Sequence, residues 1–357
     1  MRLDADNLGS LARGCALLGA GGGGDPELGL VMALTAVAQH GPVSVVTLDD
    51  LADDALIMPC GLVGAPSVAS ERIWNGDEGR ILRNAVVRLR SDRVAALMCF
   101  QIGGANGLLP VMWAARMGLP LVDADGMGRA FPELQQQAMH LAEIPASPVV
   151  LTDGRGNAQV LYGADDGWAE RVARSTAASL GGVCAGAMYC MTALQARRAA
   201  IAGSLSRAVA LGEAMSAHSP GESIEALRER HDAVVLIEGK VVHVERRADD
   251  GFVRGSATVQ DVDGRQMRLE LQNEFLLAVE DGSVRASVPD LISVLASETA
   301  DPIATERVRR GERVVVIATP APAVWRSPAG LSVVGPGTFG YDIDFAPIPG
   351  GVAHARR

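Results

Sequence analysis

Aromatic residues make up only 4% of this 357-residue chain, and features that mark several common protein classes are missing. No apolar run approaches the roughly 18 residues of a transmembrane helix, and the first residues lack the apolar core of a signal peptide. The five cysteines form no CxxC pair, and the six histidines form no HxH or HxxxH pair. We therefore expect a cytoplasmic protein without a disulfide framework or a histidine-built zinc site.

Acidic residues also outnumber basic ones, with 42 aspartate and glutamate residues against 32 lysine and arginine residues. The formal net charge is −10 at pH 7, with a sequence pI near 5.1. Nucleic acids and anionic membranes bind basic surfaces, so this balance argues against both as partners. We expect instead a small-molecule substrate and a homo-oligomer. Apolar residues make up 48% of the chain, which is enough for two domains with their own cores.

Helical and extended patterns alternate along residues 1–165. This alternation predicts an α/β domain with a largely parallel sheet. Continuous apolar runs such as VAALMCF (94–100) are typical of strands buried on both faces. The expected helices are 8–18, 26–39, 77–90, a helix ending at Gly118 and one beginning at Pro132; the expected strands include 43–47, 55–60, 94–100 and 119–123.

The second half of the chain has a different residue pattern. Residues 166–232 are predicted to be a helical connection packed on the first domain, with helices over 166–180, 184–201 and 205–217. Residues 233–357 contain short apolar segments, including LSVVG (331–335), separated by DDG, DVDG and EDG turns. That pattern predicts a small all-β domain.

A run of glycines, Gly21, Gly22, Gly23 and Gly24, precedes a helix whose start is marked by Asp25 and Pro26. Residues 19–24 formally match GxGxxG, but the segment before them is helical instead of a strand. We therefore expect no nicotinamide or flavin cofactor. A nucleotide-dependent enzyme would also need a phosphate-binding lysine nearby, and there is none. The run is either a tight turn or a set of backbone N–H groups that stabilises an anion.

Three further polar or glycine-rich loops follow predicted strands. They are GLVGAPSV (61–68), QIGGANG (101–107) and DADGMGRAFPE (123–133). Ligands of open α/β sheets collect at the carboxyl ends of the strands. We therefore expect these loops and the glycine run to converge on one cleft, with the backbone of Gly103 and Gly104 available to a bound anion.

The third loop carries the richest chemistry. Asp123 and Asp125 face the same side if the segment is extended, so they could share a proton or bind a divalent metal ion. Arg129 could hold a carboxylate through two hydrogen bonds. Glu133, just after Pro132, is a third candidate for acid–base catalysis. The structural alternatives are a strand-end turn for Asp123, an Asx-turn for Asp125 and a helix-dipole contact for Glu133.

The set of motifs resembles the S-methyl thiohydantoin desulfurase family, which is associated with hydantoinase and oxoprolinase proteins. GLPLVDADGMGRAFPEL is the most specific of them. The resemblance covers nearly the whole chain and implies an α/β domain followed by a small β domain. The motifs are GAGGGGDP (19–26), GLVGAPSV (61–68), IGGANGL (102–108), GLPLVDADGMGRAFPEL (118–134), GSLSRA (203–208), LQNEFLLAV (271–279), VPDLISVL (288–295) and VGPGTFGYD (334–342).

The resemblance implies hydrolysis of a five-membered cyclic amide or thiohydantoin-type ring, with loss of a methylthio group. In that reading Asp123 or Asp125 activates water, alone or through a divalent metal ion, and glycine N–H groups stabilise the developing charge. Asn106 binds the ring amide and Arg129 binds a carboxylate substituent. The alternative is an accessory, non-catalytic subunit of a hydantoinase or oxoprolinase system, for which a missing acid pair would be the mark.

Two positions depart from the expected family pattern. We expect an acidic residue where this chain has Gln101, and a lysine where it has Arg72. If either family residue is catalytic or reads the substrate, this chain either acts on a different substrate or has lost the activity.

Overall fold

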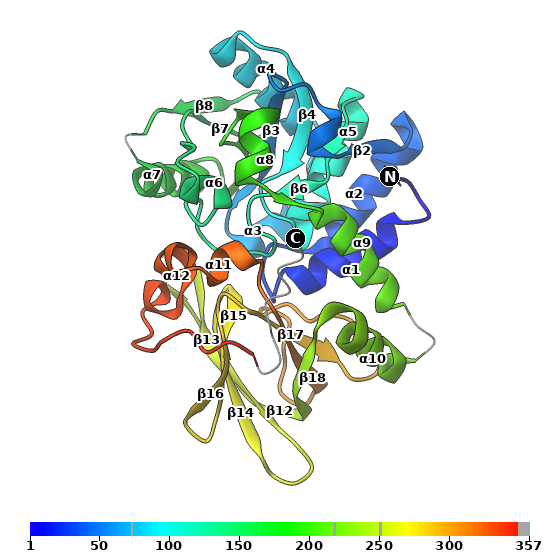
Figure 1. Ribbon diagram of the computed structural model, residues 1–357, viewed down its shortest axis with the longest axis vertical. Coiled ribbons are helices and arrows are strands. Elements are labelled where there is room, and N and C mark those ends of the chain that lie inside the picture. The colour runs from blue at the N-terminus through cyan, green and yellow to red at the C-terminus, as the bar shows by residue number, and fades with distance from the viewer. Residues whose placement is uncertain (73, 164, 217–218, 250–251, 349–357) are drawn as a thin grey trace.

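The computed structural model describes residues 1–72, 74–163, 165–216, 219–249 and 252–348, which form two units stacked along the long axis of the molecule (Figure 1). The first unit contains a sheet with helices around it, and the second is built on an antiparallel sheet. Among these residues, no helix has both the length and the apolar character to cross a membrane.

The first sheet has nine strands and is mixed. Its central pairings, β2–β5, β5–β4 and β4–β3, are parallel, and the flanking pairings are antiparallel. The predicted α/β class is thus confirmed. Along the sheet the strands are β1 (Arg2–Leu3), β2 (Val43–Val46), β5 (Leu121–Val122), β4 (Val94–Cys99), β3 (Leu56–Gly64), β9 (Val183–Ala187), β7 (Val149–Thr152) and β8 (Ala158–Leu161), with β10 (Met191–Thr192) beside β3.

Helices cover this sheet, and two of them cross at glycines. A Cβ atom on Gly14 of α1 would lie 1.7 Å from the Ala208 carbonyl oxygen of α9, and one on Gly212 of α9 would lie 1.7 Å from that of Ser10. Only glycine permits so close a crossing. The helices of the first unit are α1 (Leu8–Leu18), α2 (Pro26–His40), α3 (Pro66–Glu71), α4 (Glu78–Arg90), α5 (Leu109–Met117), α6 (Ala138–Leu141), α7 (Asp166–Ser179), α8 (Ala193–Ala199) and α9 (Ser204–Ala214). The next helix, α10 (Pro220–His231), packs on α9 (Figure 1).

The second sheet has seven antiparallel strands and confirms the predicted β domain. Two short helices, α11 (Ala323–Arg326) and α12 (Pro328–Val334), follow its last strand. The strand order is β16 (Ser283–Ser287), β15 (Glu274–Glu280), β14 (Gln266–Gln272), β13 (Phe252–Gln260), β12 (Val234–Asp249), β18 (Arg313–Thr319) and β17 (Leu291–Ala296).

Four expected elements differ from the observed ones. The segment predicted as a helix over 184–201 contains β9, which pairs with β3 and β7 inside the first sheet. Its sequence, VCAGA, is buried at every position, and short buried apolar runs do not distinguish strand from helix. Residues 331–334 of the predicted strand 331–335 belong to α12, which begins at Pro328 and is capped by Ser327.

The other two differences concern loops. The segment after Cys60 was expected to be a loop, but β3 continues to Gly64 because β9 pairs with it there. No helix begins at Pro132: residues 132–137 form turns, and α6 starts only at Ala138. The Glu133 carboxyl therefore does not lie in a first helical turn.

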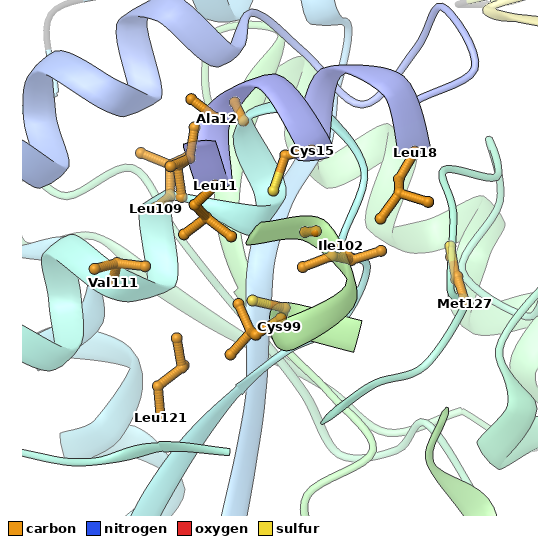
Figure 2. Packing of buried hydrophobic residues seen from close by; sticks show 14 of the residues in the cluster. Leu11, Ala12, Cys15, Leu18, Cys99, Ile102, Leu109, Val111, Leu121 and Met127 are labelled. Carbon is orange, nitrogen blue, oxygen red and sulfur yellow. The ribbon is translucent and has the colours of Figure 1, made fainter. Parts of the chain in front are cut away.

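The two units are joined through the glycine run. The Phe275 N–H donates to the carbonyl of Ala20 (2.8 Å), and the Thr305 N–H donates to that of Gly21 (2.9 Å). Next to this junction lies a hydrophobic core. Figure 2 shows Cys15 of α1, Cys99 of β4 and Ile102 among aliphatic side chains. All five cysteines are buried, with no disulfide, as the sequence predicted.

Candidate functional site

A small pocket lies where the carboxyl ends of β3 and β4 meet the β domain. Its cavity volume is about 60 Å³, well below the roughly 300–1,000 Å³ of pockets for drug-sized ligands. A site of this size suits a small ligand. Its lining residues are Gly23, Gly24, Leu62, Val63, Gly64, Ala65, Ala69, Phe100, Gln101, Asn106, Met127, Phe131, Pro132, Glu133, Leu134, Arg174, Val183, Asn273 and Glu274.

The predicted convergence of the glycine run and the loop after β4 is observed. A Cβ atom on Gly23 would lie 2.4 Å from the Gly103 carbonyl oxygen, and one on Gly104 would lie 2.4 Å from the Gly23 carbonyl carbon. The Ala105 N–H also donates to the Gly24 carbonyl oxygen, at 3.3 Å. Gly23, Gly24 and Gly104 all have positive φ angles, which glycine adopts without strain. The two loops are therefore held together backbone to backbone.

Amide side chains form part of the pocket wall. The Asn106 Oδ1 atom accepts a 2.7 Å hydrogen bond from the Leu62 N–H, which ties the loop after β4 to β3. The Gln101 Oε1 atom accepts a 3.4 Å hydrogen bond from the Phe131 N–H. Asn273, with a φ of 58°, lines the opposite wall from the β domain. Asn106, as predicted, reaches the pocket, and Gln101 does so as well.

The deepest acid of the pocket is Glu274, at the start of β15. Its side chain is only 2% exposed, and burial raises the pKa of its carboxyl group to about 8, against the lowering effect of the Arg129 charge. Within the described residues, its Oε2 atom is buried and has no hydrogen-bond partner. Its Oε1 atom lies against Gly22, where a Cβ atom would come within 2.1 Å. Gly22 thus leaves room for this carboxyl group.

Glu133 is the second acid of the pocket and the only one of the three predicted catalytic residues among its lining. It is half-buried, and its pKa is raised by burial and by the nearby charge of Glu170, while Arg174 opposes the shift. Arg174 lines the same wall; its Nε donates to Glu170 (2.6 Å) and its Nη2 to the Pro132 carbonyl (3.0 Å). The pocket therefore holds two carboxyl groups, one from each domain.

Asp123 and Asp125 face different surroundings and do not line the pocket. The Asp123 carboxylate accepts hydrogen bonds from the Ser206 N–H (3.0 Å) and hydroxyl (2.5 Å), so it caps the N-terminus of α9. Their expected common side does not arise because β5 ends at Val122 and β6 (Ala124–Asp125) pairs separately, with β11 (Ile201–Ala202).

The Asp125 carboxyl group is fully buried and organises the loop that contains it. It accepts hydrogen bonds from the N–H groups of Ile102 (2.8 Å), Met127 (3.1 Å) and Gly128 (2.8 Å). Burial nevertheless raises its pKa to about 7, because the cost of desolvation outweighs these bonds. Its position favours a structural role, related to the Asx-turn considered from the sequence.

Arg129 is also buried behind the pocket wall instead of lining it. Its Nη1 atom donates to the carbonyl oxygens of Pro289 (2.7 Å) and Asp290 (3.0 Å), and its Nε atom donates to that of Ala130 (2.9 Å). The guanidinium is thus bound by backbone carbonyls from both domains.

The remaining predicted residues lie around a second cavity beside the first. Asp25 caps α2 through a 2.9 Å bond from the Glu27 N–H and pairs with Arg307 of the β domain at 2.7 Å. Gly21 and Gly22 line this second cavity, and Gly24 lines both. Arg72 donates hydrogen bonds to the carbonyl oxygens of Val183 and Asp153. It does not line the main pocket, so its observed role is structural.

A metal site at Asp123 and Asp125 was one of two sequence-based options. Across the described ranges, no three or more histidine, cysteine, aspartate or glutamate residues are grouped as metal ligands would be. The two aspartates themselves are engaged with backbone N–H groups, as described above. Neither is arranged with other acids as a cation site.

Sequence reasoning did not single out Glu274, which the structure places in the pocket. It lies in the LQNEFLLAV segment and begins β15, whose next five residues (275–279) are apolar. A charged residue directly before the apolar run 275–279 was the available signal, since carboxyl groups are almost never fully buried unless they are paired.

Comparisons with known proteins agree with this architecture. Residues 6–163 match the S-Me-THD-like N-terminal domain, and residues 164–348 match the S-Me-THD-like C-terminal domain. The crystal structure of a protein from Chromobacterium violaceum is similar, with a TM-score of 0.82 and 23% identity, over 98% of this chain and 100% of the other. At that identity the likeness concerns the fold. No curated protein matches the chain.

Proposed function

Because the chain belongs to the S-Me-THD-like family, we propose that it is a hydrolase of a five-membered S-methyl thiohydantoin-type ring. The reaction adds water to the ring carbon that bears the methylthio group and releases methanethiol and the hydantoin. The observation that carries the proposal is the buried carboxyl group of Glu274, which lines a pocket for a small ligand at the domain boundary.

Glu274 supplies the acid in this proposal. With a pKa of about 8, its carboxyl group is largely protonated at neutral pH. A protonated carboxyl group in an apolar surrounding can donate a proton to the ring nitrogen as water attacks the adjacent carbon. Glu133, which is closer to solvent, takes a proton from the attacking water in its carboxylate form.

The second half of the reaction restores both acids. The tetrahedral carbon carries a hydroxyl group, the methylthio group and the protonated ring nitrogen. Its hydroxyl proton passes to Glu274 as the carbonyl forms, and the C–S bond breaks with its electron pair on sulfur. Glu133 protonates the leaving thiolate. The water oxygen ends in the new carbonyl, and no oxidant or reductant is needed.

The site also offers polar groups that could orient the ring. The side chains of Gln101, Asn106 and Asn273 line the pocket beside the two acids. Pockets of this kind combine an apolar wall with a few polar groups that fix the orientation of the ligand. In this proposal the amides bind the ring N–H and carbonyl groups, in line with the role expected of Asn106.

The test is thiol release by the purified protein from S-methyl thiohydantoins, followed with a colorimetric thiol reagent, with and without a chelator. Glu274→Gln keeps the size of the side chain and removes its proton transfer, so we expect a loss of 10²–10⁴-fold in kcat. Glu133→Gln should act in the same direction. Asp123→Asn, outside the pocket, is the matched control.

A wild-type protein that releases no thiol from any ring substrate would support the accessory-subunit alternative instead. A Glu274→Gln variant with wild-type kcat would remove Glu274 from the mechanism. Loss of activity with the chelator alone would point to a metal-dependent route.

A further inference from the structure

Arg129 is a buried cation that contacts Phe131, a residue of the pocket lining, without lining the pocket itself. Its side chain has 0% exposure, and its Cζ atom lies 4.7 Å from the ring centroid of Phe131, which lines the pocket. A buried guanidinium is costly unless it is hydrogen-bonded and balanced by negative charge. Its bonds to backbone carbonyls supply the first of these, and the negative charges that act on it are those of Glu274 and buried Asp290.

The backbone segment that binds Arg129 lies next to the strand that begins at Glu274. The Val288 N–H donates to the Leu276 carbonyl at 2.7 Å, so the chain before Pro289 runs beside the start of β15. Arg129 is therefore bonded to the segment of the β domain that lies next to the strand beginning at Glu274.

Each of the two side chains has one buried polar atom without a hydrogen-bond partner among the described residues, Nη2 of Arg129 and Oε2 of Glu274. Their charges are opposite and interact: Arg129 lowers the pKa of Glu274, and Glu274 raises that of Arg129, which burial reduces to about 10. The other charged groups that act on Glu274 are Arg174, which also favours its ionised form, and Glu306, which opposes it.

We propose that Arg129 is a positioning residue for Glu274, which keeps a positive charge behind the carboxyl group so that it can release and recover a proton. This inference rests on the proposed function, in which Glu274 cycles between two protonation states. Arg129 does not touch the substrate, which distinguishes this role from the carboxylate clamp expected from the sequence. Without the cation, ionised Glu274 would be left in an apolar surrounding with Arg174 as the remaining positive charge that favours it.

The test is a ¹³C NMR titration of carboxyl-labelled glutamate in the whole protein, without substrate, with the Glu274 signal assigned by its loss in Glu274→Gln. We expect Arg129→Met to raise the pKa of Glu274 by about one unit or more, the usual effect of removing an adjacent opposite charge. Arg207→Met is the matched control, because Arg207 is a largely buried cation whose charge partners are Asp125 and Asp232 instead of Glu274. It should leave the Glu274 titration unchanged.

An unchanged Glu274 titration in folded Arg129→Met overturns the proposal, and so does an equal shift in the control. If Arg129→Met does not fold, the second measurement is the folded fraction of the double variant Arg129→Met/Glu274→Gln at about pH 9, compared with that of Arg129→Met. Recovery of folding in the double variant supports a charge pair, and no recovery overturns it. Because no substrate is used, a wild-type protein that fails to release thiol but passes this titration would sink the proposed function alone.

Discussion

Replacing Glu274 with glutamine should change how the stability of the protein depends on pH. The folded protein holds the Glu274 proton up to a pKa of about 8, whereas the ordinary value for glutamate is 4.5. A carboxyl group with a raised pKa stabilises the fold fully below its unfolded pKa. That contribution is lost as the pH rises through the folded pKa.

The size of the effect follows from the same two values. Between about pH 5 and pH 8 the unfolded chain has released the proton and the folded protein has kept it. Each pH unit in this interval lowers the free energy of unfolding by ~1.4 kcal/mol. Three units therefore remove roughly 4 kcal/mol, a large share of the 5–15 kcal/mol that is typical of folded proteins. Glutamine has no proton to lose, so Glu274→Gln should lack this part of the decline.

Urea unfolding at about pH 5, 7 and 9 measures the difference between wild type and variant. The comparison must be between the two proteins, because buried Asp125, with a pKa of about 7, contributes a decline of the same sign to both. Glu225→Gln, which removes a carboxylate at the protein surface, controls for the change in net charge. Parallel pH profiles for wild type and Glu274→Gln would refute the assignment of Glu274 as a buried, protonated acid.

Three substitutions test the neighbouring assignments. Gly22→Ala should lower kcat by tenfold or more with a small change in melting temperature, because its Cβ atom would displace the Glu274 carboxyl; normal kinetics would contradict this packing. Asp123→Asn should retain activity and cost about 1 kcal/mol in urea unfolding, as the loss of a helix cap does, since Ser206 keeps a weaker acceptor. Asp125→Asn should cost more, about 2–3 kcal/mol, because an amide NH₂ would face backbone N–H donors; a cost near zero would show that the carboxyl group is not their acceptor.

The backbone part of the site could be predicted from the sequence. Glycines at 21–24 and 103–104, each placed after a secondary-structure element, indicated loops that could approach closely, and they do. Asn106 was also placed correctly in the pocket, because a short loop at the end of a buried strand leaves its side chain little choice of direction. Local spacing sufficed for these residues, since the sheet itself brings the loops together.

The acids were harder to assign, because their roles depend on distant partners. Asp123 and Asp125 have the spacing of a catalytic pair. In the structure the Asp123 carboxylate accepts a hydrogen bond from the first turn of α9, and the Asp125 carboxylate accepts hydrogen bonds from the backbone of its own loop. Glu274 is far along the chain from Gly22, and no local pattern shows that the two touch. The same limit explains β9: a buried apolar segment becomes a strand here because β3 and β7 offer it hydrogen bonds.

The chemistry of the site depends on the junction between the domains. The carbonyls of Ala20 and Gly21 accept hydrogen bonds from Phe275 and Thr305, and these bonds fix the β domain against the glycine run. Phe275 directly follows Glu274, so the bond that docks the domains also places the Glu274 carboxyl group beside Gly22. The α/β domain contributes the loop backbone, the amides and Glu133, and the β domain contributes Glu274 and Asn273. Neither domain alone contains both acids, so proton transfer in the proposed reaction requires the two to be held together.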